Sequence, residues 1–167
     1  MNIFYLDENP AIAATYHCDK HVVKMILESA QLLCTALNVT SGKQITPYKT
    51  THVNHPCAIW VRESLSNWNY VFQLMLELEK EWQFRYKHVK RHKSVSTLLE
   101  SSDNCFHFED MAKLLLADKP FTSPALAMPD HCKISSDPTE CYRYYYRTEK
   151  KDLLNYTGRE MPFWLEN

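Results

Sequence analysis

The sequence predicts a single all-α domain spanning residues 1–167, built as a bundle with two long helices, a C-terminal helix and a short extended N-terminal segment. Hydrophobic residues recur every three to four positions over two long stretches of the chain, which is the period of an amphipathic helix. A chain of 167 residues with 45% hydrophobic residues has the size and apolar content of one domain around one core. The only glycines are Gly42 and Gly158, which excludes a glycine-rich phosphate loop or dinucleotide fingerprint.

The first long helix is expected from Pro10 to Leu37. It follows an apolar run, Asn2–Leu6, and Asn9 is placed to cap it with Pro10 in its first position. Residues at three-to-four spacing define its expected apolar face: Ile12, Tyr16, Val23, Ile26, Leu27, Ala30, Leu33 and Leu37.

A loop over residues 38–54 separates this helix from the second, which starts at Pro56 and runs from Cys57 to about Lys87. A break is expected within Ser64–Asn67. The expected buried side comprises Ile59, Leu65, Trp68, Phe72, Met75, Leu78 and Trp82.

Three further helices are expected, at Ser94–Glu100, Phe106–Ala117 and Pro138–Tyr156. The prolines between Lys119 and Asp137 predict a surface loop. Asp137 begins a capping box for the last helix, and Gly158 is placed to end it.

Charge and cysteines point to an intracellular protein. The net charge is −1, so nucleic-acid contacts would need a local basic patch. The six cysteines form no C-x-x-C pair, and no signal peptide or long apolar run precedes them. We therefore expect reduced thiols, no membrane association and a cytoplasmic location, in the host cell if the protein is viral.

A ladder of polar residues on the first helix is the main candidate site. At roughly 100° per residue, its members fall within an arc of about 80°: His17, His21, Lys24, Glu28 and Gln31. This arc lies nearly opposite the apolar face and fits a solvated stripe, but its histidines and glutamine are unusual there. Asp19 points toward the apolar side, so we expect it to be paired and structural.

The histidines also allow a metal alternative. His17 and His21 lie one helical turn apart, and His52 and His55 precede the second helix, so four imidazoles could hold a divalent ion. Such pairs arise readily by chance, and no cofactor or metal ligand is assigned.

Basic and aromatic residues alternate on the last helix. Arg143 and Arg147 could contact phosphates while the neighbouring tyrosines stack on bases, although Tyr142 and Tyr146 could equally bury their rings in the core. The remaining candidates for substrate binding are Lys20, Gln31, Tyr48, His52 and His55.

Four segments carry a resemblance to a group of phage and large-DNA-virus proteins. They are the run His17-Cys18-Asp19-Lys20-His21-Val22-Val23-Lys24-Met25, the motif Asn54-His55-Pro56, the tyrosine-rich segment from Tyr142 to Lys150, and the closing Pro162-Phe163-Trp164. The order of elements also resembles, more distantly, the pyrimidine-dimer DNA glycosylase/AP-lyase superfamily of T-even phages.

The second resemblance implies an all-helical fold in which the N-terminal amine attacks a sugar carbon and forms an imine, assisted by a glutamate on the first long helix. In the corresponding region of this chain His21 or Lys24 stands where the acidic residue is expected, and Glu28 lies about one turn further along. Asn2 follows Met1 and is bulky enough to leave the initiator methionine in place, so the terminal amine would belong to Met1.

Three functions are therefore considered. The first is a base- or nucleotide-processing enzyme acting on the N-glycosidic bond of DNA or a nucleotide. In it, His17 and His21 move protons, Glu28 orients a histidine or stabilises a sugar cation, and Lys24 contacts phosphate or forms the imine. The others are a metal-dependent nuclease or phosphoesterase, and a non-catalytic viral protein that binds a nucleotide or a partner.

Overall fold

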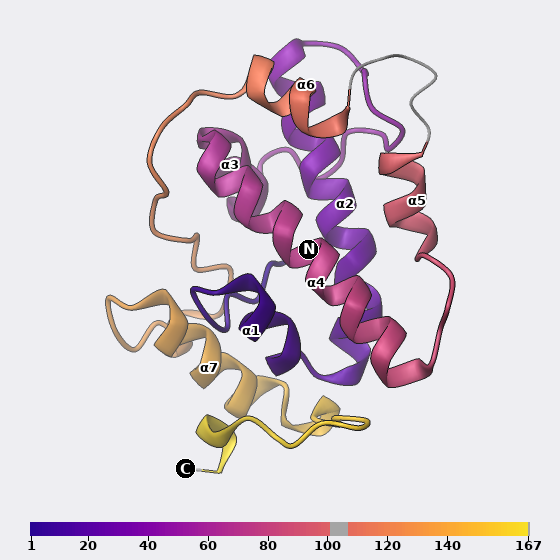
Figure 1. Cartoon of the computed structure of the whole chain (residues 1–167). Helices are drawn as coiled ribbons and strands as arrows, with labels where there is room; N and C mark the ends of the chain where they lie inside the picture. The colour runs from indigo at the N-terminus through magenta and orange to yellow at the C-terminus, as the bar shows by residue number, and fades with distance from the viewer. Residues whose placement is uncertain (101–106, 167) are drawn as a thin grey trace.

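The computed structural model describes residues 1–100 and 107–166, and its regular structure is helical throughout that part of the chain (Figure 1). The predicted all-α bundle with two long helices, a C-terminal helix and an extended N-terminal segment is confirmed. The helices are α1 (Pro10–Tyr16), α2 (Asp19–Ser41), α3 (Pro56–Glu63), α4 (Leu65–Tyr86), α5 (Lys93–Leu99), α6 (Phe108–Leu115) and α7 (Pro138–Glu149). Three short 3-10 turns follow α6: η1 (Asp130–Cys132), η2 (Lys151–Leu153) and η3 (Phe163–Leu165).

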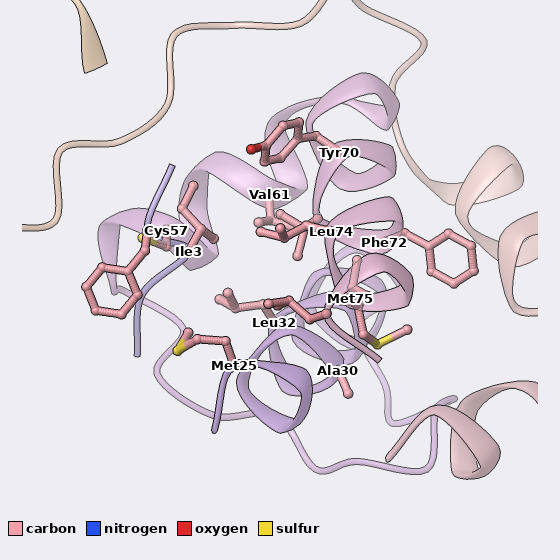
Figure 2. Packing of buried hydrophobic residues seen from close by; sticks show 14 of the residues in the cluster. Ile3, Met25, Ala30, Leu32, Cys57, Val61, Tyr70, Phe72, Leu74 and Met75 are labelled. Carbon is pink, nitrogen blue, oxygen red and sulfur yellow. The ribbon is translucent and has the colours of Figure 1, made fainter. Parts of the chain in front are cut away.

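The core lies between α2 and α4, with the N-terminal segment inserted against it. Figure 2 shows Leu32 of α2 and Leu74 of α4 facing each other, with Ile3 of the N-terminal segment beside Cys57 of α3. Ile3, Phe4, Tyr5 and Leu6 are all buried. The first residues of the chain are therefore held by the core, which fixes the position of the terminal nitrogen.

The two ends of the bundle are covered by different helices. α7 and the C-terminal segment lie at one end, next to α1, whereas α6 lies at the opposite end near the end of α2 (Figure 1). The long connection from α6 to α7 runs along the outside of α3 (Figure 1). This connection contains η1 and packs it against α7.

The first predicted helix is divided in two, which corrects the expectation of one helix from Pro10 to Leu37. His17 and Cys18 are extended (ψ 133° and 161°), and Cys18 occupies the N-cap position of α2 without a capping hydrogen bond from its side chain. Arg85 of α4 holds the break, because its guanidinium donates to the carbonyls of Thr15 and His17 at 2.9 and 2.8 Å. These carbonyls would otherwise be unsatisfied at the end of α1.

Asp19 is paired, as predicted. Its carboxylate accepts hydrogen bonds from Arg85 at 3.0 Å and from the hydroxyl of Thr157 at 2.7 Å. Burial raises its pKa, but the bonds from Thr157 and Arg85 outweigh this effect and leave the pKa below its ordinary value.

The predicted apolar face of the first helix is partly wrong. Ile12, Val23 and Leu27 are exposed, whereas Val22 and Met25 join Ile26, Ala30 and Leu33 in the core. The break at Cys18 and the N-terminal segment packed on α2 broaden and rotate its buried side. α2 also continues to Ser41, four residues beyond the expected end, and stops at Gly42 with φ 69°.

The predicted break in the second helix is confirmed at Ser64. This residue is extended, ends α3 and caps α4 through its hydroxyl, which accepts from the Asn67 amide at 3.1 Å. The expected buried residues Trp68, Phe72, Met75 and Leu78 are buried, but Ile59 is exposed.

The C-terminal helix begins as predicted and ends early. The Asp137 carboxylate accepts from the Thr139 amide at 2.8 Å, as a cap should. α7 ends at Glu149 rather than Tyr156, and Gly158, with φ 68°, serves a later turn instead of ending the helix. The helices expected at Ser94–Glu100 and Phe106–Ala117 correspond to α5 and α6, and Phe106 lies outside the described residues.

Cys18, Cys34, Cys57, Cys132 and Cys141 are free thiols, as predicted. Cys105 lies outside the described residues. By length and composition alone, α2 is the one described helix that could cross a membrane, but 67% of its apolar window is buried inside the fold, as in a core helix.

Candidate active site at the chain's first nitrogen

The structure brings the first nitrogen of the chain to the Glu28 carboxylate. The Met1 nitrogen lies 3.8 Å from Glu28 Oε2, and the Asn2 amide donates to the same oxygen at 3.1 Å. The other oxygen, Oε1, lies 3.1 Å from Lys24 Nζ, one turn earlier on α2. One carboxylate therefore lies between two amines, an α-amine and a lysine.

Burial differs sharply among these three groups. The side chains of Met1 and Glu28 are only 2% and 13% exposed, whereas that of Lys24 is 67% exposed. The Met1 side chain anchors the amine in the core, and Lys24 forms the solvent edge of the site.

Asn2 fixes the backbone that carries the amine. Its side-chain oxygen accepts from the amides of Ile3 and Phe4 at 2.8 and 2.9 Å, and its side-chain nitrogen donates to the carbonyl of Ala127 at 2.8 Å. Phe4 then adopts a left-handed conformation with φ 44°, which is strained for an aromatic residue. Asn2 could not be recognised as a site residue from the sequence, because no motif marks it and only the fold shows its bonds.

His55 lies within electrostatic range of this site, as part of the predicted pair with His52. Its ring caps α3 by accepting from the Cys57 amide at 3.2 Å. Partial burial lowers its pKa, the Met1 amine and His52 lower it further, and Glu28 raises it. His52 is exposed, has φ 48° and shares a 2.7 Å hydrogen bond with the Thr51 hydroxyl.

His17 and His21, by contrast, are core residues, which corrects their expected position on a solvated ladder. His17 Nδ1 donates to the Ala13 carbonyl at 2.7 Å, and its Nε2 has no partner among the described residues. His21 stacks on Phe4 at 4.3 Å, and its Nδ1 lies 2.5 Å from the Tyr146 hydroxyl. The predicted ladder is therefore divided: His17 and His21 lie in the core, whereas Lys24 and Glu28 lie at the amine site.

Burial also removes the proton-transfer role expected for these two histidines at neutral pH. It lowers the pKa of His17 to about 4. Burial lowers the pKa of His21 to about 3, with smaller effects in the same direction from His17, Lys150 and Lys24. Both imidazoles are therefore neutral at pH 7.

This burial predicts that acid destabilises the protein as the pH falls from about 6.5 to about 4 for His17 and to about 3 for His21. Unfolded histidines gain protons below about pH 6.5, whereas the folded His17 and His21 stay neutral down to about 4 and about 3. Stability is then full above pH 6.5 and falls with pH by about 1.4 kcal/mol per unit for each histidine. Urea unfolding at several pH values measures the slope. His21→Phe should remove the contribution of His21 to this slope, and the exposed His52→Gln should leave the slope unchanged. A free energy of unfolding that does not vary with pH in this range would contradict the burial of two neutral histidines.

The other expected substrate-binding residues of this region are placed unevenly. Lys20 is exposed at the start of α2, and Gln31 is partly exposed three residues after Glu28. Tyr48 packs its ring on the core, and its carbonyl accepts from Asn38 at 3.0 Å. Lys20 and Gln31 therefore share α2 with the amine site, whereas Tyr48 supports the loop after that helix.

The last helix does not present the expected face of basic and aromatic residues. Tyr142 and Tyr146 are buried, as the core alternative predicted. Arg143 points inward, where it pairs with Asp7 at 3.0 Å and donates to the Leu6 carbonyl at 2.9 Å. Arg147 donates to the Trp164 carbonyl at 3.2 Å. Both half-buried arginines hold terminal segments of the chain against α7, and their contact with phosphate stays a prediction.

The four-histidine metal alternative is also contradicted. Among the described residues, His17, His21, His52 and His55 do not bring their ring nitrogens together as a ligand group. His17 and His21 face Phe4 and Tyr146 in the core, while His52 lies at the surface. The nuclease hypothesis loses the metal site on which it depended.

Comparisons with known proteins give no relative: no family model, no curated protein and no solved structure matches this chain significantly.

Proposed function

We propose that this protein cleaves the N-glycosidic bond of DNA by forming an imine between the Met1 α-amine and the sugar, with Glu28 as the assisting carboxylate. One observation carries the proposal: the chain's first nitrogen lies 3.8 Å from a carboxylate on the first long helix that is itself largely covered. A terminal amine and a glutamate on the first long helix are the two groups that the resemblance to the glycosylase/AP-lyase superfamily implies.

The chemistry follows from these groups. The free amine attacks C1′ of the deoxyribose, the bond from C1′ to the base breaks, and the base leaves with a proton. The sugar ring opens as the second amine proton moves to the ring oxygen O4′, which leaves a C1′=N imine to Met1. Loss of a C2′ proton to Glu28 or water then breaks the C3′–O bond, and the downstream strand leaves with its 5′ phosphate. Water hydrolyses the imine and frees the Met1 amine. Glu28 accepts the amine proton and stabilises positive charge that develops on the sugar.

An α-amine suits this role better than a lysine at neutral pH. In general the pKa of an α-amine is about 8, against about 10.4 for a lysine side chain, so more of it is present as the free base. In this proposal the exposed Lys24 contacts a DNA phosphate, with Lys20, Gln31 and His52 as further contacts along the same side. Five free thiols among the described cysteines support a reducing compartment such as the cytoplasm.

Borohydride trapping tests the proposal. DNA with a single abasic site, mixed with the protein and sodium borohydride, should give a stable covalent adduct, and peptide mass mapping should locate it on Met1. Intact mass of the untreated protein checks that the Met1 amine is free. A variant carrying two extra residues before Met1 should lose the adduct, and Lys24→Gln should keep it while binding DNA more weakly.

Other outcomes would contradict the proposal in distinct ways. An adduct on Lys24 would transfer the nucleophile to the lysine. Absence of any adduct would exclude the imine mechanism, and DNA or nucleotide binding without turnover would then favour the non-catalytic viral protein.

A further inference from the structure

A second cluster of reactive side chains lies where the long connection meets the end of α7, formed by His131, Cys132 and Glu149. One ligand atom from each residue lies within 4.8 Å of the other two. His131 Nε2 and Glu149 Oε1 are 2.8 Å apart. Among the described residues no other group of three histidine, cysteine or carboxylate side chains meets in this way.

We propose that His131, Cys132 and Glu149 bind a divalent transition-metal ion of the zinc type, with a water molecule as the fourth ligand. An imidazole nitrogen, a thiolate sulfur and a carboxylate oxygen are the three donor types that zinc uses in proteins. Such a set excludes Mg²⁺ and Ca²⁺ as preferred ions, since those take oxygen ligands.

Binding an ion requires only small movements: the His131 and Glu149 ligand atoms, now 2.8 Å apart, would separate slightly around the ion, and all three ligand atoms already lie within 4.8 Å of one another. In a tetrahedral zinc site the ligand atoms lie about 3.4–3.6 Å apart, given metal bonds of about 2.0–2.3 Å. The side chains of His131 and Glu149 are 60% and 42% exposed and can turn toward an ion. Cys132 is buried, with Sγ 3.9 Å from the Thr148 hydroxyl, so its sulfur is the fixed point of the site.

The neighbouring lysines do not occupy this position. Lys133 pairs with Asp130 at 2.7 Å, and the Lys150 ammonium lies over the Tyr145 ring at 4.7 Å.

A bound ion would tie η1 to the C-terminal end of α7. It would close the segment from Cys132 to Glu149 and so hold the long connection on the helix that buries Tyr142 and Tyr146. Its expected effect is therefore on stability, independent of the amine site on α2.

Cobalt titration of the full-length, tag-free and reduced protein tests this site, because Co²⁺ reports both sulfur ligation and coordination number in its spectrum. We expect one Co²⁺ per chain, with a sulfur-to-cobalt charge-transfer band and the intense ligand-field bands of four-coordinate cobalt, all displaced by Zn²⁺. Zn²⁺ alone should raise the melting temperature.

Matched variants locate the binding. Cys132→Ser should abolish the charge-transfer band and weaken Co²⁺ binding by at least about 100-fold, since even outer-shell changes cost roughly 10–100-fold. Cys141→Ser is the control, because this buried thiol donates to the Ser135 carbonyl at 3.3 Å and lies outside the cluster. His131→Gln and Glu149→Gln change exposed side chains, so they test the site without disturbing the core, and each should weaken binding.

Two results would overturn the proposal. One is Co²⁺ binding without a charge-transfer band in the unmodified protein. The other is a band that persists in Cys132→Ser, or that disappears in Cys141→Ser, because either would place the sulfur ligand elsewhere. Borohydride trapping should be unchanged in all four variants, so failure here would leave the proposed glycosylase chemistry unaffected.

Discussion

Glu28→Gln is expected to slow imine formation with abasic DNA by at least about 100-fold, within the range of about 10²–10⁴ attributed to general acid–base groups. The amide can still accept the hydrogen bond from the Asn2 amide, so the N-terminal segment should stay in place. It cannot take a proton from the Met1 amine, and it carries no charge to stabilise a positive sugar. The rate of borohydride trapping with excess protein measures this step directly.

Glu77→Gln is the matched control. Glu77 makes the same kind of local ion pair, 2.6 Å from Lys80 on α4, and its side chain is 22% exposed. Its trapping rate should equal that of the unmodified protein, and both variants should keep the unmodified melting temperature within a few degrees. Undiminished trapping by Glu28→Gln would mean that the carboxylate positions the N-terminal segment and takes no part in the reaction.

The helix ends were largely predictable because local residues make them. Asn9, Ser64 and Asp137 each accept a hydrogen bond from an amide two or three residues later, and the types of these residues are visible in the sequence. The break at Cys18 was not predictable in the same way. Its carbonyls are satisfied by Arg85, which is about seventy residues away in the sequence and adjacent only in the fold.

The candidate site was predicted in part. Glu28 and Lys24 follow from the polar ladder, and Met1 from the resemblance to the lyases, but the sequence could not show that Asn2 joins them. Helical periodicity placed His17 and His21 on the solvent side, because it cannot account for an N-terminal segment and a distant helix packing on both sides of α2. The cluster at His131 escaped detection because Glu149 lies 17 residues after Cys132 and the three residues match no spacing motif.

The buried arginine that holds this break should be the most sensitive point of the fold. Arg85 is buried and bonds to two carboxylates, Glu81 at 3.0 Å and Asp19 at 3.0 Å, besides the carbonyls of Thr15 and His17. Arg85→Met keeps much of the side-chain volume and removes all the donors. We expect it to lower the free energy of unfolding by about 3–5 kcal/mol, the usual cost of leaving buried charges unpaired. Urea denaturation at pH 7 measures the loss.

Lys80→Met provides the contrast, since Lys80 pairs with Glu77 at 2.6 Å but is 68% exposed. The Lys80–Glu77 pair is as short as the pairs of Arg85. A surface pair nevertheless contributes only about 0–1 kcal/mol to the free energy of unfolding, because water solvates both charges. A loss below about 1 kcal/mol in Arg85→Met would mean that water or Arg159, which already lies 2.5 Å from Glu81, replaces the missing donors. The break between α1 and α2 would then depend on the packing of the N-terminal segment, and the position of the Met1 amine would be independent of α4.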